Sequence, residues 1–409
     1  MKYIKFIIIA TILISCSGQA EKTNEEILEI QPYLDFLEHQ NMSAKNYVLS
    51  LFKTNDIVIL SERKHYEYTQ YKTIIDIISD DYFINNVKNI FVEVGVSTEQ
   101  EKVDEFLNSE NLTESEISEK ALAIYRNIPF LASWDKTVYY DFLINLYQIN
   151  QNLEPDKKLR LYYSDIPFSW AKIKSQDEYR LFLDTINTRD SIIASQIINN
   201  YENIKFDNKK ALVIMNYRHG FTNIYLKSEE KKVNNVGRFL KEKYKDKVAS
   251  VLINDIYMDL KDDYYPIQNG KWDAAFEYMK KSDIGFNFKD SPFGNDKFDM
   301  YPVENDLTYK DVFTGFIYTS PIDSFIFKKG VKNYISSEFE NEYTRRMILA
   351  GFQANVREDT IRMDWHYTEK MWCPNYDTVR FQIDEYKHAT TRNKKHRAES
   401  AKFERHNIK

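Results

Sequence analysis

The sequence has 409 residues, enough for one large domain or two ordinary ones, and 43% of them are hydrophobic. Its 10 Gly and 9 Pro are too few for a collagen-like chain, a repeat-rich β fold or long disordered linkers. The net charge of −6 disfavours non-specific binding of nucleic acid, so we expect no nucleic-acid partner.

The first residues are typical of a bacterial targeting signal. Lys2 and Lys5 precede an apolar run, residues 6–14, that is too short to cross a membrane comfortably. The segment Leu13-Ile14-Ser15-Cys16 resembles the lipobox of bacterial lipoproteins, and the resemblance implies cleavage before Cys16 and acylation of this cysteine. We therefore expect a lipoprotein of the cell envelope, anchored to a bacterial membrane on its periplasmic or surface side. The alternative is a plain secretory signal with an incidental cysteine.

The composition along the chain suggests four parts. They are residues 1–16 as a signal peptide, 17–24 as a tether, 25–386 as a single α/β domain and 387–409 as a basic tail. The tail has eight Lys or Arg against two Glu, which is typical of a solvated end. Within the domain, residues 260–330 are punctuated by glycines and prolines. We expect them to form either a lid over a cleft or an irregular connection packed by its own aromatic side chains.

Apolar runs and helical periodicity predict alternating strands and helices along the domain. We expect strands at residues 56–60, 89–94, 159–164, 211–216, 248–257 and 315–319. We expect helices near residues 25–39, 44–53, 71–78, 98–108, 114–126, 135–150, 176–201 and 233–244, and helical character again over 333–388. Thr23-x-x-Glu26, Ser97-x-x-Gln100 and Thr113-x-x-Glu116 have the pattern of capping boxes. The alternation predicts an α/β fold with a central, largely parallel sheet flanked by helices, because continuous apolar strands need cover on both faces.

Ionisable side chains follow four of the predicted strands. Glu62 and His65 come after the first strand, Glu93 ends the second, Asp165 follows the third and His219 follows the fourth. Ligands of open α/β sheets bind outside the carboxyl ends of the strands, where parallel strands bring such residues together. We therefore predict one shared polar site; the alternative is that these residues have unrelated capping and surface roles.

Two kinds of chemistry fit this set of residues. If Glu62 and Glu93 are neighbours, repulsion between their carboxylates raises the pKa of one of them or is offset by a nearby cation. The candidate cations are Arg63, Arg126, Arg189 and Arg218. A histidine oriented by carboxylates is a general base, whereas the same nitrogen and oxygen atoms also suit a divalent transition metal. The metal ligands would be Glu62, His65, Glu93 and His219. The sequence contains no G-x-S-x-G, P-loop or G-x-G-x-x-G motif.

The order of these residues resembles a known superfamily. Ser61-Glu62-Arg63-Lys64-His65 is similar to the G-E-x-x-H segment of the erythromycin esterase, ChaN and Tiki superfamily, with Ser61 in place of Gly. Other matching segments are Glu93 at its strand end, Trp134 leading a helix to Asn150, Asp165, Arg189-Asp190 opening a helix, and His219. The resemblance implies an α/β fold with a helical insertion. It also implies a cleft in which His65 is the base, supported by Glu62 and Glu93, with His219 opposite.

The leading functional hypothesis is an envelope-anchored hydrolase. It would cleave an ester or amide bond in a small molecule or a peptide, with water activated by His65 or by a bound metal. In this hypothesis Asp165 orients His219 or the metal ligands, and Arg189 stabilises the developing oxyanion.

Two alternatives remain open at this point. One is a lipoprotein of the ChaN type that binds haem, iron or another small ligand without hydrolysis. Tyr66, Tyr68 and Tyr217 are its candidate contacts, because tyrosine and histidine both bind haem iron. The other is a degenerate relative with a structural role in an envelope assembly.

Overall fold

The computed structural model describes residues 24–130, 137–205, 209–226, 231–258, 264–300, 306–364 and 367–370. The predicted signal peptide, Cys16, the tether up to residue 23, Trp134 and the basic tail lie outside the described residues. Within the described residues, no helix combines the length and the apolarity needed to cross a membrane.

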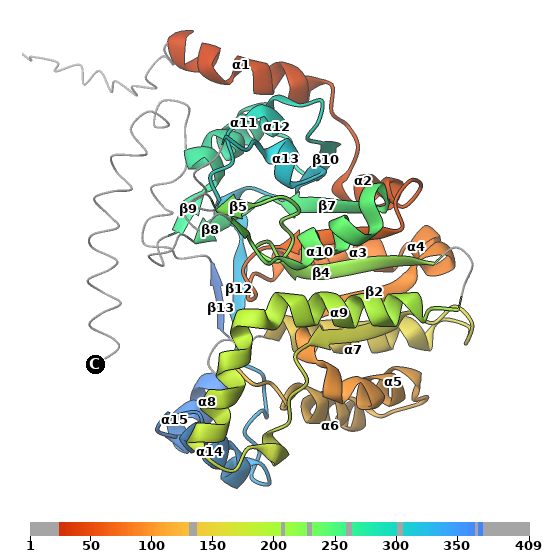
Figure 1. Ribbon diagram of the computed structural model, residues 1–409, viewed down its shortest axis with the longest axis vertical. Helices are drawn as coiled ribbons and strands as arrows, with labels where there is room; N and C mark the ends of the chain where they lie inside the picture. The colour runs from red at the N-terminus through yellow and green to blue at the C-terminus, as the bar shows by residue number, and fades with distance from the viewer. Residues whose placement is uncertain are drawn as a thin grey trace, which may run out of the picture.

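The centre of the molecule is a seven-stranded sheet in the order β10-β11-β7-β1-β4-β2-β3 (Figure 1). Its strands are β1 (Ile57–Glu62), β2 (Lys88–Val96), β3 (Arg160–Asp165), β4 (Lys210–Asn216), β7 (Val248–Ile253), β10 (Ile284–Asn287) and β11 (Gly315–Tyr318). The pairs are parallel except that β10 runs antiparallel to β11. The predicted α/β fold with a largely parallel sheet is thus confirmed.

Helices and short strands surround this sheet. The helices are α1 (Asn24–Glu38), α2 (Ala44–Leu51), α3 (Thr69–Ile78), α4 (Asp81–Asn86), α5 (Gln100–Asn108), α6 (Glu114–Tyr125), α7 (Thr137–Gln151), α8 (Gln176–Asp184), α9 (Arg189–Glu202), α10 (Val236–Tyr244), α11 (Lys271–Met279), α12 (Pro292–Asn295), α13 (Tyr309–Val312), α14 (Glu340–Leu349) and α15 (Val356–Asp364). The short strands form three antiparallel pairs, β5 (Tyr225–Leu226) with β6 (Lys231–Lys232), β8 (Ile256–Met258) with β9 (Tyr264–Pro266), and β12 (Ile326–Lys329) with β13 (Tyr367–Lys370).

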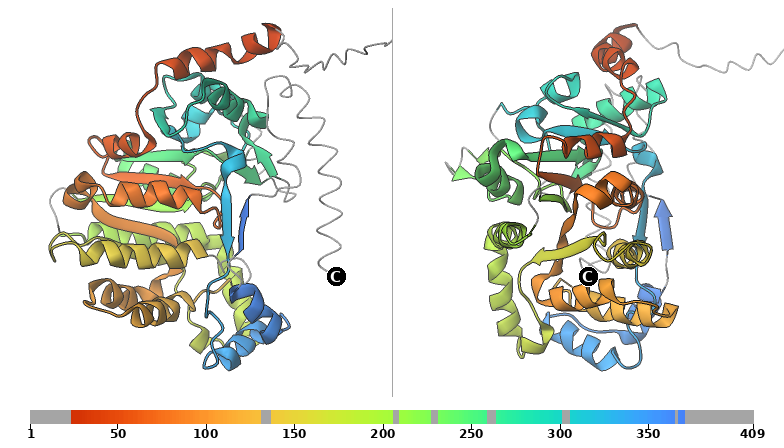
Figure 2. Two further views of the ribbon diagram at one scale, coloured as in Figure 1. Left: turned by 180° about the vertical axis from the view of Figure 1, so that it is seen from behind. Right: turned by 90° about the vertical axis from the view of Figure 1, so that its right-hand side faces the viewer.

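The two faces of the sheet bury different sets of side chains. In β1, Val58 and Leu60 pack into the hydrophobic core that includes α2, α3 and α5–α7, whereas Ile57 and Ile59 pack against α9 and α10. This alternation is the period of two that a strand imposes. The two views in Figure 2 show helices on both sides of the sheet. Both faces being covered explains why the strands are continuous apolar runs.

Three local predictions are wrong. The predicted helix 176–201 is interrupted by a 3₁₀ turn at Thr185–Thr188, so that α9 begins anew at Arg189. The turn contains Thr, Ile, Asn and Thr, which are poor helix formers. Ser97 lies in a 3₁₀ turn and caps no helix, whereas the Thr113–Glu116 capping box is present. Strand β13 lies within the segment predicted to be helical, because its pairing with β12 overrides local propensity.

Residues 260–330 contribute a second core rich in aromatic side chains. Strands β10 and β11 extend the main sheet, and α11–α13 pack beside them. The rings of Phe276 and Tyr318 are stacked with centroids 3.8 Å apart. Figure 1 shows this region with α1 at one end of the long axis, whereas α8, α14 and α15 lie at the other end. The role of this segment as a lid stays a prediction.

Candidate acid–base site

The sheet order brings the four predicted strand ends together. β1, β4, β2 and β3 are consecutive neighbours, and Glu62 at the end of β1 is the Cα partner of Asn216 at the end of β4. β2 has an irregular register with β3 between Val92 and Val96, which is where Glu93 lies. Bulges of this kind are common beside active sites because they redirect side chains.

A glycine makes this irregularity of β2 sterically feasible. Gly95 has a φ of +139°, a value that L side chains rarely adopt. A Cβ atom at this position would lie 2.4 Å from the ring of Tyr163 on β3. The Val-Glu-Val-Gly sequence of β2 therefore allows the backbone turn that follows Glu93, together with the close approach of the Tyr163 ring.

Glu93 is the centre of the site. Its Oε1 atom lies 3.1 Å from Arg189 Nη2, 3.1 Å from His219 Nε2 and 3.7 Å from His65 Nε2. Its Oε2 atom accepts a hydrogen bond from the backbone N–H of Asn216 at 2.8 Å. Burial alone would raise the pKa of Glu93, but His219, His65 and Arg189 hold this pKa well below its usual range. Glu93 is therefore a buried carboxylate that stays ionised.

His65 is held by Glu62 and two tyrosines. Its Nδ1 atom lies 2.8 Å from Glu62 Oε1, and its side chain is 21% exposed whereas that of Glu62 is 1% exposed. Tyr71 donates to Glu62 Oε2 at 2.9 Å, and Tyr139 donates to Glu62 Oε1 at 3.0 Å and also contacts His65 Nδ1. Burial, followed by the charge of Glu62, raises the pKa of both phenols well above the usual value. A carboxylate on Nδ1 favours the tautomer with the proton on that nitrogen, so that Nε2 is the nitrogen able to take a proton.

His219 lies between two carboxylates. Its Nδ1 atom is 2.9 Å from both oxygens of Asp190, and its Nε2 atom faces Glu93. Burial lowers the pKa of His219, but Glu93 and Asp190 together raise it to about 10. The imidazole is therefore an imidazolium cation near neutral pH. Asp190, rather than the predicted Asp165, is the carboxylate that orients His219.

Asp165 instead binds Arg189. Arg189 Nε donates to Asp165 Oδ1 at 2.7 Å, and Arg189 Nη1 lies 3.4 Å from His219 Nε2. Burial raises the pKa of Asp165, and Arg189 offsets only part of this effect. Because Nε and Nη2 of Arg189 are directed at two buried acids, this guanidinium neutralises the carboxylates of the site. The geometry supports this role better than the predicted stabilisation of an oxyanion.

The other candidate cations are engaged elsewhere. Arg63 is fully buried, with Nη1 2.8 Å from Glu67 Oε2 and Nε bonded to the carbonyl of Asn254. Arg126 donates to the carbonyl of Tyr334 at 2.9 Å. Arg218 Nε donates to the hydroxyl of the preceding tyrosine at 3.4 Å. These three arginines secure neighbouring loops.

The tyrosines proposed for haem contact are packed against other side chains. The ring of Tyr66 lies 4.7 Å from that of Phe327, and Lys328 Nζ lies 3.3 Å from the ring centre of Tyr68. Tyr217 is only 3% exposed and belongs to the aromatic core. These contacts give no specific support to a haem site.

Sequence reasoning missed the roles of Tyr71, Tyr139 and Asp190. Asp190 adjoins Arg189 in the segment that resembles the superfamily, so that its position was a usable signal. Tyr71 and Tyr139 lie on the inner faces of α3 and α7, where aromatic residues usually serve packing. Only the packing of α7 against α3 brings their two hydroxyls to one carboxylate.

Three of the four predicted metal ligands converge. Among the described residues, Glu62, His65 and Glu93 each offer one ligand atom, and these atoms lie within 4.8 Å of one another. The donor set suits zinc or iron. However, Glu93 Oε1 already faces Arg189 and His219, and Glu62 accepts hydrogen bonds from two tyrosines. A metal would have to share the Glu93 oxygen with cations and the Glu62 oxygens with two phenol donors, so the arrangement fits acid–base chemistry better.

Ser61 occupies ordinary strand geometry. It lies within β1, is fully buried, and does not have a positive φ. The residue after His219 is Gly220, and a Cβ atom there would lie 2.0 Å from Ser61 Oγ. The side chain of Ser61 thus fits in this position because Gly220, in the segment after β4, has no side chain.

Solved structures of other proteins resemble this protein in fold. No protein-family model matches the sequence, and no curated protein matches it. The structure is similar to a succinoglycan biosynthesis protein, with 10% identity, a TM-score of 0.48, and coverage of 73% of this chain and 98% of the other. It is also similar to a mutant erythromycin esterase in its open conformation (11%, TM-score 0.44, 70% and 94%) and to haem-bound ChaN of Campylobacter jejuni (15%, TM-score 0.33, 56% and 92%). Likeness at this level of identity does not extend to chemistry.

Proposed function

We propose that the protein is a hydrolase that cleaves an ester or amide bond with a water molecule activated by His65. The observation that carries this proposal is the orientation of the His65 ring. Glu62 holds Nδ1 at 2.8 Å, and Nε2 faces Glu93 at 3.7 Å. This separation is longer than a direct hydrogen bond and is one that a single water molecule can bridge.

The proposed reaction uses this arrangement in two steps, the attack of water and the departure of the leaving group. Nε2 of His65 takes a proton from water, and the water oxygen attacks the carbonyl carbon of the substrate. The proton then passes from Nε2 to the leaving oxygen or nitrogen as the bond between this atom and the carbonyl carbon breaks, which releases the acid and the alcohol or amine. Glu62 stabilises the imidazolium that forms transiently on His65, as a carboxylate does in other hydrolases that use a histidine base. Water is the nucleophile in this proposal because the sequence contains no G-x-S-x-G motif.

We propose that His219 favours the developing oxyanion through its positive charge alone, because its two ring nitrogens already face Asp190 and Glu93. It is a cation near neutral pH, with its pKa raised to about 10. Its side chain is 17% exposed and shares Glu93 Oε1 with His65. A preorganised positive charge at this position lowers the energy of a tetrahedral intermediate.

An activity comparison tests the proposal. Purified protein is assayed on a panel of aryl and alkyl esters and peptide amides, with His65→Ala as the test variant. We expect His65→Ala to lose at least about 100-fold in kcat/KM. The matched control is His39→Ala, since His39 is an exposed histidine on the first turn after α1. Equal activity of His65→Ala and the unaltered protein on every substrate that is cleaved would overturn the proposal.

A second measurement separates the acid–base mechanism from a metal mechanism. We expect the activity to survive a chelator and elemental analysis to find no stoichiometric transition metal. Activity that is lost with the chelator and restored by a divalent metal would assign Glu62, His65 and Glu93 to metal binding instead. A Soret band on titration with haem, lost in His65→Ala, would favour the ligand-binding alternative.

We also propose that the protein is a lipoprotein attached to a bacterial membrane through Cys16. The support is the lipobox pattern that ends at this cysteine. In cells, Cys16→Ser should move the protein from the membrane fraction to the soluble fraction and abolish its labelling by a radioactive fatty acid. Unchanged fractionation and labelling would contradict the anchor.

A further inference from the structure

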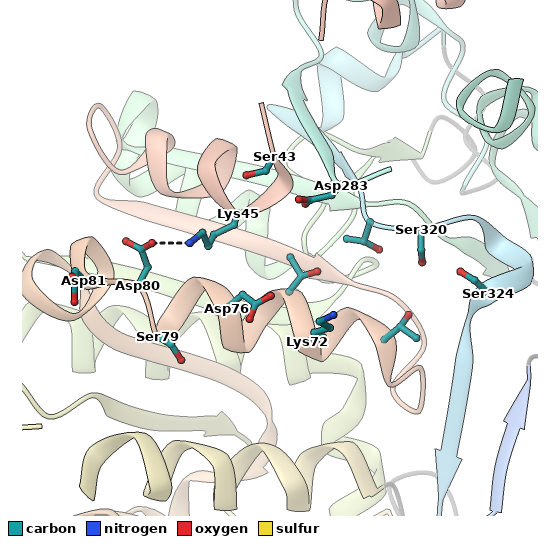
Figure 3. Close-up of a pocket in the computed structure, with 13 residues that line it drawn as sticks. Ser43, Lys45, Lys72, Asp76, Ser79, Asp80, Asp81, Asp283, Ser320 and Ser324 are labelled. Atoms are coloured by element: carbon teal, nitrogen blue, oxygen red, sulfur yellow. Dashed lines mark hydrogen bonds and ion pairs between the residues drawn. The ribbon is translucent and has the colours of Figure 1, made fainter. Parts of the chain in front are cut away.

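A hollow lies along α3 (Figure 3). Its volume is about 780 Å³, within the range of small-molecule sites. Every lining residue that the structure describes is Ser, Thr, Lys or Asp. The lining consists of Ser43, Lys45, Thr69, Lys72, Thr73, Asp76, Ser79, Asp80, Asp81, Asp283, Thr319, Ser320 and Ser324. We call this hollow the polar groove.

The polar groove has two facing walls. One wall is α3, where Thr69, Lys72, Thr73 and Asp76 share one face at helical spacing while the opposite face of the helix is buried in the core. Figure 3 shows Ser43, Asp283 and Ser320 on the other wall, which comes from the start of α2 and the segments beside β10 and β11. The polar face of a surface helix usually faces open solvent, but the polar face of α3 lies opposite a second polar surface.

The charges of the groove exclude an anionic ligand. The lining has four Asp and two Lys, so that its net charge is −2. Lys45 is paired with Asp80 at 3.0 Å, which is the dashed line in Figure 3. A phosphate or carboxylate ligand would therefore meet mainly carboxylates. Like charges at short range are strongly disfavoured.

The groups of the groove suit hydroxyls. Seven lining residues carry a hydroxyl and four carry a carboxylate, and oxygens of both kinds can accept hydrogen bonds from a ligand O–H. No aliphatic or aromatic side chain is among the described lining residues, so that an apolar ligand or a hydrophobic peptide would find only Thr methyl groups and Lys stems to pack against.

We infer that the polar groove binds a neutral polyhydroxylated ligand, that is, an uncharged carbohydrate chain. The groove is joined to the segment that carries Glu62 and His65 through one buried arginine. Arg63, which lies between Glu62 and His65 in the chain, donates to Thr69 Oγ1 at 3.2 Å and to Thr319 Oγ1 at 2.6 Å, and both threonines line the groove. The inference rests on the groove alone and does not require the proposed hydrolase activity.

The experiment measures binding by the whole protein. The probes are two neutral trisaccharides, maltotriose and cellotriose, and one anionic trisaccharide, trigalacturonate. Saturation-transfer NMR detects contact, and calorimetric titration gives the dissociation constant. We expect saturable but weak binding of at least one neutral probe and no saturable binding of trigalacturonate, because hydrogen bonds exchanged with water give modest net affinity.

Matched variants locate the binding. Asp76→Asn removes one carboxylate of the groove, and we expect it to weaken the neutral probe by about tenfold. Thr73→Val removes one hydroxyl at nearly constant volume and should weaken binding less. Asp177→Asn is the control, because Asp177 is exposed on α8 outside the groove. Circular dichroism checks that all variants fold, which we expect since Asp76 is exposed.

Three results would overturn the inference. They are no saturable binding of either neutral probe, binding of trigalacturonate as tight as that of a neutral probe, and neutral binding that is unchanged in both groove variants. Loss of hydrolysis in His65→Ala with trisaccharide binding intact would show that the groove and the proposed active site are separate properties of the protein.

Discussion

Two regions of the molecule bury carboxylates, and they handle the charge in opposite ways. At the carboxyl edge of the sheet, Glu93 faces Arg189 and His219, which hold its pKa well below the usual range despite burial. In the aromatic core, burial raises the pKa of Asp273 to about 7, although Tyr318 donates to this carboxylate at 2.6 Å. Burial likewise raises the pKa of Asp299, which Tyr309 contacts, to about 6.

The difference shows what is needed to keep a buried carboxylate ionised. A phenol stabilises the anion through one hydrogen bond, which offsets only part of the desolvation cost. A guanidinium and an imidazolium add full positive charges in a medium of low polarity, and their attraction exceeds that cost. An ionised carboxylate beside two histidines in a partly exposed site is a candidate for chemistry, because pKa values shifted by specific charge partners cluster at functional sites. The contrast therefore favours a chemical role, rather than a purely structural one, for Glu93 and its neighbours at the carboxyl ends of the strands.

Removing the guanidinium is the strongest way to break this contrast. In Arg189→Met, the carboxylates of Glu93 and Asp165 stay buried without their shared cation. We expect the free energy of unfolding to fall by about 3–5 kcal/mol, measured by urea denaturation. Arg180→Met is the control, because Arg180 makes an exposed ion pair whose loss should cost less than about 1 kcal/mol. An effect of Arg189→Met no larger than that of the control would show that Glu93 does not depend on this charge.

The close contact between Ser61, near the end of β1, and Gly220, in the segment after β4, provides the next test. In Gly220→Ala, the new Cβ would lie 2.0 Å from Ser61 Oγ. We expect a loss of about 1–3 kcal/mol in the free energy of unfolding, since a tightly packed region tolerates added atoms poorly. Combining Gly220→Ala with Ser61→Gly should restore much of this loss, because the nearest remaining atom to that Cβ is then the carbonyl oxygen of Tyr217, 3.4 Å away. A strictly additive double variant would mean that the two positions do not touch.

The pKa of His219 can be changed while the histidine itself is kept. Its pKa of about 10 lies above the usual 6.5, so that its ionic contribution to stability is fully present below pH 6.5 and is lost as the pH rises through about 10. Asp190→Asn removes one of the two carboxylates, and we expect the pKa of His219 to fall by about 1–3 pH units while staying raised by Glu93. An NMR titration of the His219 ring measures this change. The same titration curve in both proteins would exclude the Asp190 carboxylate as a cause of the raised pKa.

The last test lies in the aromatic core. Because the pKa of Asp273 is about 7 in the folded protein and near 3.8 when exposed, the folded state holds this proton more tightly. Its contribution to stability is therefore present below pH 3.8 and is lost as the pH rises through about 7. Asp273→Asn should show a shallower loss of unfolding free energy across this window. Parallel curves for the variant and the unaltered protein would contradict the raised pKa.

Much of the framework could be predicted from local patterns. Continuous apolar runs located the strands, and the residues that end them, Glu62, Glu93 and His219, meet in the structure. Parallel strands force such ends to one edge, so that the convergence needed no knowledge of packing. The break before Arg189 and strand β13 were missed because neither has a strong local signal.

The sequence by itself determined which residues are buried in strands and which ionisable residues stand at strand ends, since both depend on neighbours a few positions away. Only the tertiary structure decided how those residues pair: Asp190 with His219, Asp165 with Arg189, and Tyr71 and Tyr139 with Glu62. These partners come from α3, α7 and α9, and their meeting depends on strand order and helix packing between distant segments. Local periodicity specifies which face a residue occupies, but it carries no information about which distant segment packs against that face.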